Sequence, residues 1–369
     1  MWGRSGWGPQ ARGVGLSTVR DLSVGVIGAG YWGPNLARNF RTSPDWDLTA
    51  VCDLDAGRAR KVVGPRSTVE VMTSVPELLA RADIDAVAIA TPAATHAPIA
   101  LAALQAGKHV LVEKPLADTS PAALQMIARA NELDRVLMVD HTFCYTPVVA
   151  KIRELVADGS LGDITFVDSV RINLGLVQRD VNVFWDLAPH DLSILDFILP
   201  GGLAPLGVAA QAADPLGTGQ PSVGYLTMPL AGGGIAHVHV NWLSPTKIRQ
   251  MVIGGTRRTV VWDDVNPQQR LTVYDRGVDL SPAGRTDKAA INVSYRLGDA
   301  WAPALPEKEA LGQMVGEFAA SIRAGRASRT DGPSGLRVLD VLEASGRSLT
   351  QHGRLVAVGQ PAELTEASA

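Results

Sequence analysis

Short apolar runs alternate with helical stretches between Leu22 and about Asp140, and this alternation restricts the fold more than any other feature of the chain. The runs have the length of strands that are buried on both faces of a sheet. The expected strands are Val24–Ile27, Leu48–Cys52, Ala86–Ala90, Val110–Val112 and Val136–Val139, and the expected helices are Pro34–Arg41, His96–Ala106 and Pro121–Asn131. Strand–helix repetition with short connections predicts an α/β domain with a doubly wound parallel sheet.

The pattern changes after about Thr146, where strand candidates separated by Gly, Pro, Asn and Asp predominate. These expected strands are Ile164–Asn173, Ser222–Met228, Ile235–Trp242, Ile248–Ile253, Thr259–Trp262 and Leu271–Tyr274, and the expected helices are Val148–Asp158, Asp186–Leu199, Lys308–Arg323 and Gly335–Thr350. Strands joined by short turns predict an α+β domain with an open, mostly antiparallel sheet. We therefore expect a flexible extension over residues 1–21, a parallel-sheet domain over residues 22–145, and an α+β domain for substrate binding and oligomerisation over residues 146–369.

The charge balance and the cysteine count exclude several classes of protein. Lys and Arg total 34 against 37 Asp and Glu, a net charge of −3, so the chain lacks the basic character of proteins that bind nucleic acid or an anionic membrane. No apolar run is long enough to span a bilayer, and the first 21 residues lack the apolar core of a signal peptide. Cys52 and Cys144 are too few for a disulfide framework, which fits the reducing cytoplasm.

A glycine-rich turn follows the first expected strand directly and leads into a helix. Gly28 permits the tight turn, Gly30 lets the backbone approach a pyrophosphate, and Gly33 lets the helix pack closely on the strand. The amide groups that open the helix then attract the phosphates. Pro34 suits this position because its missing N–H would have no helical partner. This turn predicts a dinucleotide site.

The end of the second expected strand carries the residue that would select the dinucleotide. Asp53 follows Gly33 at the spacing of an acidic residue that accepts hydrogen bonds from the adenosine ribose hydroxyls and repels a 2′-phosphate, which favours NAD over NADP. A cap for the helix beginning near Ala56 explains the same residue as an alternative. Arg58 and Arg60 fit a solvated helix face.

Two further turns are expected at the same edge of the parallel sheet, where such sheets bind their ligands. Thr91-Pro92 would lie beside the nicotinamide half of the dinucleotide, and for His96 capping or packing is an equal alternative to catalysis. Glu113-Lys114-Pro115 would place Lys114 near a substrate hydroxyl, unless it is an ordinary surface lysine. The Lys114–Pro115 peptide is a candidate for the cis form.

Asp186 and His190 are four residues apart and would share one face of a helix. Pro189 predicts that this segment is the first turn of the helix, where proline is tolerated. The positive end of the helix dipole would then keep His190 neutral, as a proton acceptor needs to be. A capping Asp beside a packed His is the alternative.

The expected strand Ile235–Trp242 has two different faces. His237 and His239 lie on one of them without a carboxylate motif beside them, so no metal site is expected. Val238, Val240 and Trp242 lie on the other, where a helix or a second subunit would bury them. An open sheet with an apolar face predicts a homodimer or homotetramer formed through this sheet.

A family resemblance rests on the segments GVIGAGYWGPNLARNF, VCDLD, AVAIATPAATHAPIALAALQAGKHVLVEKPLA, VDHTFCYTP and FWDLAPHDLSIL. Together they resemble, over roughly Val24 to Leu199, the glucose–fructose oxidoreductase, inositol dehydrogenase and rhizopine-catabolism (Gfo/Idh/MocA) family. The resemblance implies a Rossmann domain followed by an open-faced α+β domain, often assembled into dimers or tetramers. It also implies that Lys114, Asp186 and His190 are catalytic.

The resemblance implies an NAD-dependent oxidoreductase that interconverts a secondary alcohol and a ketone on a sugar. The motifs are most similar to those of enzymes that act on nucleotide-linked sugars, such as UDP-N-acetylglucosamine-type 3-dehydrogenases, with inositol, other polyols or free sugars as the second substrate class. A non-catalytic NAD-binding sensor and a hydrolytic enzyme that recycles NAD are alternatives of other classes. The residues expected to contact the cofactor are Gly28, Gly30, Tyr31, Trp32, Gly33, Asp53, Thr91, Pro92, His96, Glu113 and Lys114. Those expected near the substrate are Tyr145, Arg171 and Asn173. A solvated strand face explains Arg171 and Asn173 equally well.

Overall fold

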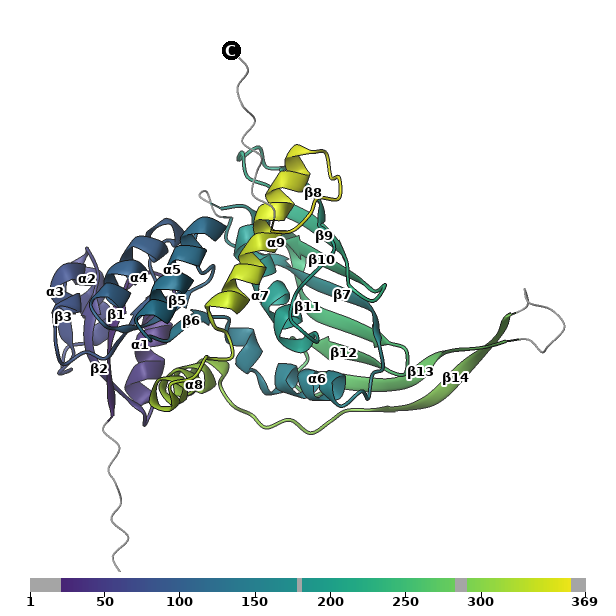
Figure 1. Cartoon of the computed structure of the whole chain (residues 1–369), viewed down its shortest axis with the longest axis horizontal. Helices are drawn as coiled ribbons and strands as arrows, with labels where there is room; N and C mark the ends of the chain where they lie inside the picture. The colour runs from purple at the N-terminus through teal and green to yellow at the C-terminus, as the bar shows by residue number, and fades with distance from the viewer. Residues whose placement is uncertain (1–20, 178–180, 283–290, 360–369) are drawn as a thin grey trace, which may run out of the picture.

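The computed structural model describes residues 21–177, 181–282 and 291–359. The expected flexible extension lies outside the described residues, apart from Asp21. Figure 1 shows two units side by side, each built on its own sheet. The first, in purple and blue, contains the N-terminal part of the chain, and the second, mostly teal and green, contains the larger sheet.

The first unit is a six-stranded parallel sheet in the order β3-β2-β1-β4-β5-β6. Its strands are β1 (Leu22–Ile27), β2 (Trp46–Cys52), β3 (Glu70–Met72), β4 (Ala86–Ile89), β5 (His109–Glu113) and β6 (Leu137–Asp140). The order reverses between β1 and β4, and a crevice for a ligand forms at such a switch point beyond the carboxyl ends of the strands. The expected doubly wound sheet is confirmed.

Helices cover both faces of this sheet, as the nearly continuous burial of its strands requires. They are α1 (Gly33–Thr42), α2 (Ala56–Val63), α3 (Val75–Leu79), α4 (His96–Gln105) and α5 (Ser120–Glu132). One core lies beneath α1 and α2, and the other beneath α3, α4 and α5. The short elements β3 and α3 were not expected from the sequence because neither has a long periodic pattern.

The second unit is an eight-stranded sheet in the order β14-β13-β12-β11-β7-β10-β9-β8. Its strands are β7 (Ile164–Leu174), β8 (Ala209–Ala213), β9 (Val223–Pro229), β10 (Ile235–Asn241), β11 (Leu243–Gly255), β12 (Thr259–Asp263), β13 (Leu271–Pro282) and β14 (Ile291–Trp301). Only the β7–β10 pair is parallel among the described strand pairs of this sheet, which confirms the expected mostly antiparallel character.

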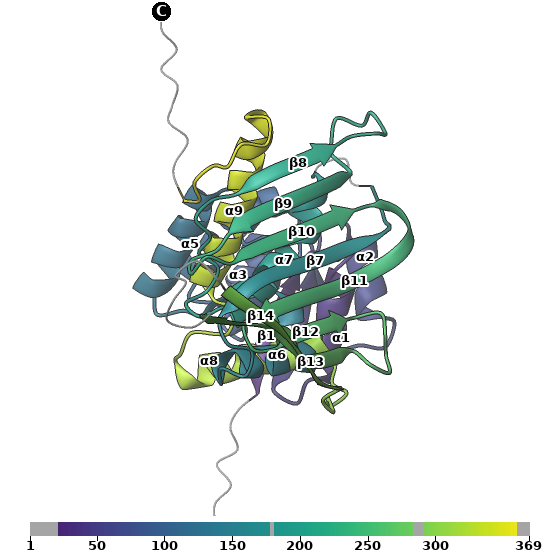
Figure 2. The same ribbon diagram turned by 90° about the vertical axis from the view of Figure 1, so that its right-hand side faces the viewer.

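Three helices cover one face of the second sheet, namely α6 (Pro147–Ala157), α7 (Val183–Ile198) and α9 (Gly332–Thr350). Val238, Val240 and Trp242 are buried in the core on this side, so a helix and not a second subunit covers them. The packing is tight: a Cβ on Gly224 of β9 would lie 2.3 Å from the Phe184 ring of α7. Figure 2 faces the opposite side of the sheet, which no helix covers in the described chain.

Helix α8 (Ala310–Ala324) departs from the expected division of the chain, because it packs on the first sheet. Phe318 stacks on Trp46 with 5.2 Å between ring centroids, and the Trp46 indole N–H donates to the Val315 carbonyl at 2.8 Å. The second part of the chain therefore completes the core of the first. This contact joins residues more than 250 positions apart, so no local pattern predicts it.

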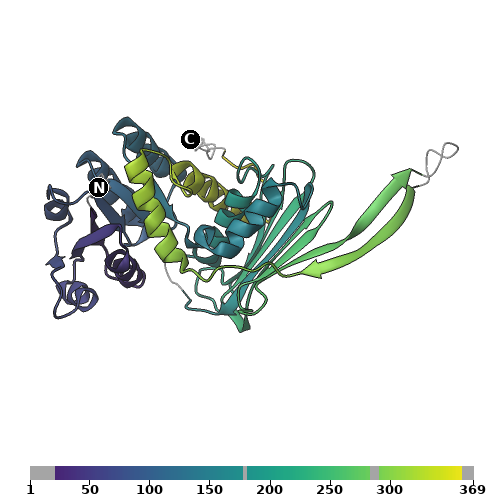
Figure 3. The same cartoon turned by 90° about the horizontal axis from the view of Figure 1, so that it is seen from below.

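Strands β13 and β14 continue beyond the sheet as a two-stranded ribbon that stands away from the rest of the molecule (Figures 1 and 3). The sequence predicted only the first residues of β13, and β14 was not expected. No described helix is long and apolar enough to cross a membrane.

Candidate active site

The glycine-rich turn has the geometry of a phosphate cradle. Gly28 has φ +99°, and a Cβ there would lie 2.5 Å from the Ala90 carbonyl oxygen. A Cβ on Gly33 would lie 2.0 Å from the Gly28 oxygen, so α1 can start this close to the strand only with glycine at that position. A Cβ on Gly30 would meet no atom within 4 Å, which leaves open space beside the backbone where a pyrophosphate would lie.

Asp53 lies beside this turn at the end of β2. Its carboxylate accepts hydrogen bonds from the amides of Ala29 and Asp55, each at 2.8 Å, and forms an ion pair with Arg58 at 3.0 Å. The alternative reading of Asp53 as a helix cap is wrong, because Asp55 caps α2 by accepting from the Gly57 and Arg58 amides. Arg58 therefore belongs to the site, and not only to a solvated helix face.

His96 ties two of the strand ends together. Its Nδ1 lies 2.8 Å from the Pro115 carbonyl oxygen and its Nε2 lies 2.8 Å from the Thr91 carbonyl oxygen. The ring is buried, and burial lowers its pKa. The Lys114–Pro115 peptide is cis, as anticipated. His96 thus holds the turns after β4 and β5 in place from behind, and it plays a packing role.

A cavity of about 600 Å³ opens along these turns. The expected residues that line it are Gly28, Gly30, Tyr31, Trp32, Asp53, Thr91, Pro92, Glu113, Lys114 and Asp186, and the lining residues that sequence reasoning did not assign to it include Arg58 and Thr95. The cavity follows the carboxyl ends of β1, β2, β4 and β5, joins the glycine cradle to Lys114, and so fits an extended dinucleotide.

Lys114 and Asp186 meet where the two units face each other. The Lys114 ammonium donates to the Asp186 main-chain carbonyl at 2.8 Å and lies 3.4 Å from its carboxylate. The other carboxylate oxygen accepts from the Trp242 indole N–H at 2.9 Å. Asp186 is therefore held from both sides, by a strand end of the first unit and by the second sheet. Trp242 is a positioning residue that the sequence did not indicate.

The start of α7 differs from the sequence-based expectation. The helix begins at Val183, where the Asn182 side chain caps the Phe184 and Trp185 amides. Pro189 consequently lies inside the helix and His190 lies about two turns from its start. The helix dipole acts within the first turn, so it does not account for a neutral His190.

Burial and neighbouring cations keep His190 neutral instead. Burial, followed by the charges of Lys114 and Arg171, lowers the pKa of His190 well below its ordinary value. The buried Nδ1 has no hydrogen-bond partner within the described chain, and the ring contacts Phe143 edge to face at 5.1 Å between centroids. His190 is thus a neutral imidazole with an unused nitrogen. The same is true of His141, whose two ring nitrogens are buried without a partner among the described residues and whose pKa burial lowers to about 4.

Glu113 of the cavity lining and the buried Asp140 form an acid pair. Burial and the nearby Asp140 carboxyl raise the pKa of Glu113 well above its ordinary value, and burial also raises the pKa of Asp140. The Trp32 indole N–H donates to Asp140 at 2.6 Å, and the Thr142 hydroxyl donates to it at 2.5 Å. Trp32 thereby joins the glycine-rich turn to β6 on the far side of the switch point.

Two residues expected near the substrate are engaged elsewhere. Arg171 is 3% exposed and pairs with Asp191 of α7 through bonds of 2.8 and 2.9 Å, so its charge is already neutralised. Tyr145 is 3% exposed and its hydroxyl bonds to Thr330 at 2.9 Å. Neither side chain is free to bind a substrate group. Asn173 is partly exposed on the same face of β7 as Arg171 and stays a candidate.

Arg249 of β11 is the cation that sequence reasoning missed. It is the cross-strand partner of Arg171, so both side chains lie on the helix-covered face of the sheet. Its only described ion pair is a long one with Asp264 at 3.6 Å, and its buried Nε has no hydrogen-bond partner among the described residues. Burial and the charge of Arg171 lower the pKa of Arg249, and its charge acts in turn on His190.

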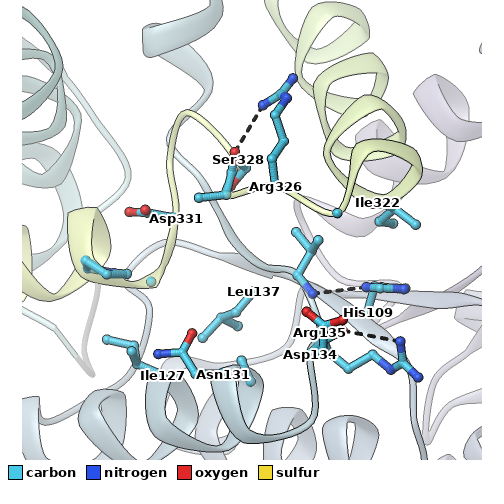
Figure 4. Close-up of a pocket in the computed structure, with 16 residues that line it drawn as sticks. His109, Ile127, Asn131, Asp134, Arg135, Leu137, Ile322, Arg326, Ser328 and Asp331 are labelled. Atoms are coloured by element: carbon cyan, nitrogen blue, oxygen red, sulfur yellow. Dashed lines mark hydrogen bonds between the residues drawn. The ribbon is translucent and has the colours of Figure 1, made fainter.

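Figure 4 shows a second pocket, of about 390 Å³, that lies at the amino ends of β5 and β6. His109, Arg135 and Asp331 are among its lining residues. Parallel sheets bind cofactors at the opposite edge, so this pocket is separate from the dinucleotide site. Among residues 21–177, 181–282 and 291–359, no group of three or more His, Cys, Asp or Glu side chains is arranged to hold a metal ion.

Comparisons with known proteins agree with this geometry. Residues 22–141 match the model of an oxidoreductase family with an NAD-binding Rossmann fold, and residues 149–261 match the Gfo/Idh/MocA C-terminal domain. An uncharacterized oxidoreductase of Escherichia coli is 30% identical over 70% of this chain and 78% of its own length. A UDP-N-acetylglucosamine 3-dehydrogenase of Acidithiobacillus ferrooxidans is 29% identical over 86% of this chain and 94% of its own. The crystal structure of GenD2 from gentamicin A biosynthesis in complex with NAD has a TM-score of 0.77 and 26% identity, covering 96% of this chain and 100% of that one.

Proposed function

The chain belongs to the Gfo/Idh/MocA family of NAD-binding oxidoreductases, and we propose that it interconverts a secondary alcohol and a ketone on a nucleotide-linked sugar. The contact between Lys114 and Asp186, at the end of the dinucleotide cavity, supports this reaction most directly. His190 lies one turn further along the same helix. A proton acceptor, a cation and a carboxylate are thereby available where the two units meet.

In the oxidative direction, His190 accepts the hydroxyl proton of the substrate as a neutral imidazole. Lys114 donates a hydrogen bond to the same oxygen and stabilises the negative charge that develops on it. Asp186, fixed by Trp242, orients Lys114 and contacts the sugar. Bound NAD supplies the hydride acceptor, and the glycine cradle and Asp53 hold it.

The positive charge of Arg249 and the similarity to an enzyme of known substrate both favour a nucleotide-linked sugar. Arg249 offers a guanidinium that no strong ion pair within the described chain neutralises, and a diphosphate or a sugar carboxylate would pair with it. The similar Acidithiobacillus ferrooxidans enzyme is a UDP-N-acetylglucosamine 3-dehydrogenase. A free polyol such as inositol would leave Arg249 without a partner, which makes polyols the second candidate class.

The test is a panel of nucleotide-linked sugars, with and without a carboxylate, beside inositol and free sugars, each with NAD. Absorbance of NADH reports oxidation. Turnover confined to nucleotide-linked sugars supports the proposal, and turnover confined to polyols assigns the second class. Binding of NAD with no turnover on any compound supports the sensor hypothesis, and product release without accumulated NADH supports a hydrolytic reaction.

Replacing Asp53 with serine is expected to raise the ratio of kcat/KM for NADP to that for NAD by about one to two orders of magnitude. The change removes a carboxylate that repels a 2′-phosphate and releases Arg58 from its ion pair. Parallel titrations of both cofactors measure the ratio. Asp55→Ser is the matched control, since it removes a neighbouring carboxylate, keeps a side chain that can cap α2, and leaves the ribose position untouched. Equal use of both cofactors by the unmodified enzyme would contradict the role of Asp53.

Replacing Arg249 with glutamine is expected to raise the KM for a nucleotide-linked sugar about 10- to 100-fold, the usual strength of a hydrogen bond to a charged group. The KM for NAD should stay unchanged, because Arg249 does not line the dinucleotide cavity. Initial-rate kinetics separate the two constants. Arg270→Gln, an exposed arginine between β12 and β13, is the control. An unchanged sugar KM would remove Arg249 from the substrate site.

We also propose that the enzyme is a homodimer or homotetramer assembled through the uncovered face of the second sheet, and that it works in the cytoplasm. Tyr225, Phe166, Val170 and Val252 lie on that face, and an antiparallel sheet that faces water normally carries polar residues there. The two cysteines are free and buried, which fits a reducing compartment.

A further inference from the structure

His190 and His141 are two imidazoles whose buried nitrogens make no hydrogen bond within the described chain. Nδ1 of His190 and both ring nitrogens of His141 are buried, and none of the three has a partner among the described residues. Buried polar groups nearly always bond to the protein or to an ordered water. The three nitrogens therefore call for a partner, and the reaction described above gives His141 no role.

His141 lies beside the helix that carries His190. It follows β6 directly, it is 1% exposed, and the short turn that comes after it packs on α7. In that turn, the Phe143 ring contacts the His190 ring edge to face, and the Cys144 thiol donates to the Ser193 carbonyl of α7 at 3.3 Å. A positive charge on His141 lowers the pKa of His190. The two imidazoles are therefore neighbours across the boundary between the two units.

The two ring nitrogens of His190 have different surroundings. Nδ1 is buried, whereas Nε2 keeps accessible surface and makes no hydrogen bond to any described residue, so Nε2 is the nitrogen that a substrate can reach. A neutral imidazole carries one proton, and Nε2 can accept a substrate proton only when that ring proton is on Nδ1. A base at this position therefore requires a buried Nδ1–H, and a buried donor without an acceptor is unfavourable.

His141 is the neighbouring group that can accept this hydrogen bond. Arg249 and Trp262 also have buried unpartnered nitrogens on the helix-covered face of the second sheet, but guanidinium and indole nitrogens only donate. The carboxylate of Asp191, the next residue along α7, is already engaged by Arg171. Burial lowers the pKa of His141 to about 4, so near pH 7 its ring is neutral and one of its nitrogens is an acceptor.

We propose that one buried water links Nδ1 of His190 to a ring nitrogen of His141. The water accepts from the Nδ1–H of His190 and donates to the unprotonated nitrogen of His141, which holds His190 in the tautomer whose Nε2 is free to accept a proton. His141 is then a positioning residue that acts through His190 and does not touch the substrate. This inference rests on the role of His190 as the base in the proposed function.

The first test reads the tautomer of His190 and needs no substrate. The full chain is labelled with ¹⁵N-histidine, and the signals of His190 among the seven histidines are assigned by their loss in His190→Asn. Solid-state ¹⁵N spectra are expected to show the Nδ1–H tautomer in the unmodified protein and a mixed or reversed tautomer in His141→Phe. An Nε2–H tautomer in the unmodified protein, or an unchanged tautomer in His141→Phe, would overturn the proposal.

The matched control for this substitution is His109→Phe. His109 opens β5 at the opposite edge of the first sheet, where its Nδ1 accepts from the Val136 amide, so its loss should leave the signals of His190 unchanged. NAD binding should be equal in the control and in His141→Phe, because neither histidine lines the dinucleotide cavity, and this shows that both variants are folded.

The second test separates positioning from packing by kinetics. His141→Phe is expected to lower kcat about tenfold or more, the effect of losing one hydrogen bond to the base, and to leave the KM for the substrate nearly unchanged. An amide oxygen can replace an imidazole acceptor, so kcat should recover in His141→Gln or His141→Asn, according to which nitrogen accepts. A low kcat in both amide variants would overturn the proposal, because His141 would then act only by its shape.

The two tests also distinguish this inference from the proposed function. A His190 tautomer that depends on His141, together with no turnover on any compound of the panel, contradicts the proposed reaction and leaves the link between the two histidines standing. Turnover on a nucleotide-linked sugar with an Nε2–H tautomer of His190 supports the reaction and overturns the link.

Discussion

Replacing His190 with asparagine is expected to lower turnover about a hundredfold or more while NAD still binds, since a general base contributes about 10²–10⁴ in rate. Asparagine keeps a polar side chain of similar reach but cannot accept and hold a proton near neutral pH. His190 does not line the dinucleotide cavity, so cofactor affinity should not change. Steady-state rates on the substrate found in the panel, with NAD binding followed by fluorescence, measure both quantities.

The control for this change is His352→Asn, an exposed histidine just beyond α9. Its φ is +56°, a conformation that asparagine adopts readily, so the control should keep both stability and turnover. If His190→Asn retains near-normal turnover, His190 is not the base, and the buried imidazole of His141 becomes the residue to test.

Replacing Lys114 with alanine is expected to lower turnover by about 10²–10³, the effect of removing one preorganised group that stabilises a developing oxyanion. Cofactor affinity should fall less, because Lys114 forms only one end of the cavity. Lys308→Ala, which removes an exposed lysine ahead of α8, is the matched control. Equal losses in kcat and in NAD affinity would indicate a cofactor ligand and not a catalytic group.

The same variant also has a signature in the pH profile. After burial, the charge of Lys114 is the largest cause that lowers the pKa of His190. The unmodified enzyme should therefore stay active below pH 6.5, the ordinary pKa of a histidine. Without that positive charge the imidazolium form is less disfavoured, and the pKa rises. The acid limb of kcat/KM should therefore move to higher pH in Lys114→Ala. If the acid limb of kcat/KM does not move, His190 is not the group whose protonation sets that limb.

The parts of the site that local rules describe could be predicted from the sequence. Gly28, Asp53 and Lys114 each follow a buried strand, and the carboxyl ends of parallel strands share one edge. Their positions along the chain therefore place them around one crevice. The structure confirms the parallel sheet, and it brings these residues to the same cavity.

Other features depend on contacts that no local pattern records. Proline is tolerated in the first turn of a helix, so Pro189 predicts that the helix starts close to it. In the structure Asn182 caps the helix about two turns before Pro189. Arg171 looked available for a substrate anion, yet Asp191 lies across the helix–sheet interface and neutralises it. No local sequence pattern indicates Arg249, because its position near the site depends on its register with Arg171 across two strands.

The return of α8 to the first sheet has a consequence for how the chain is made. Residues 22–145 leave the ribosome before α8 does, so the surface around Trp46 and Phe40 stays open until α8 has followed them out of the exit tunnel. The nascent dinucleotide-binding half therefore keeps an apolar surface uncovered while the whole second sheet is synthesised, and chaperones bind surfaces of this kind. The core beside Trp46 therefore cannot be completed before α8 has been made.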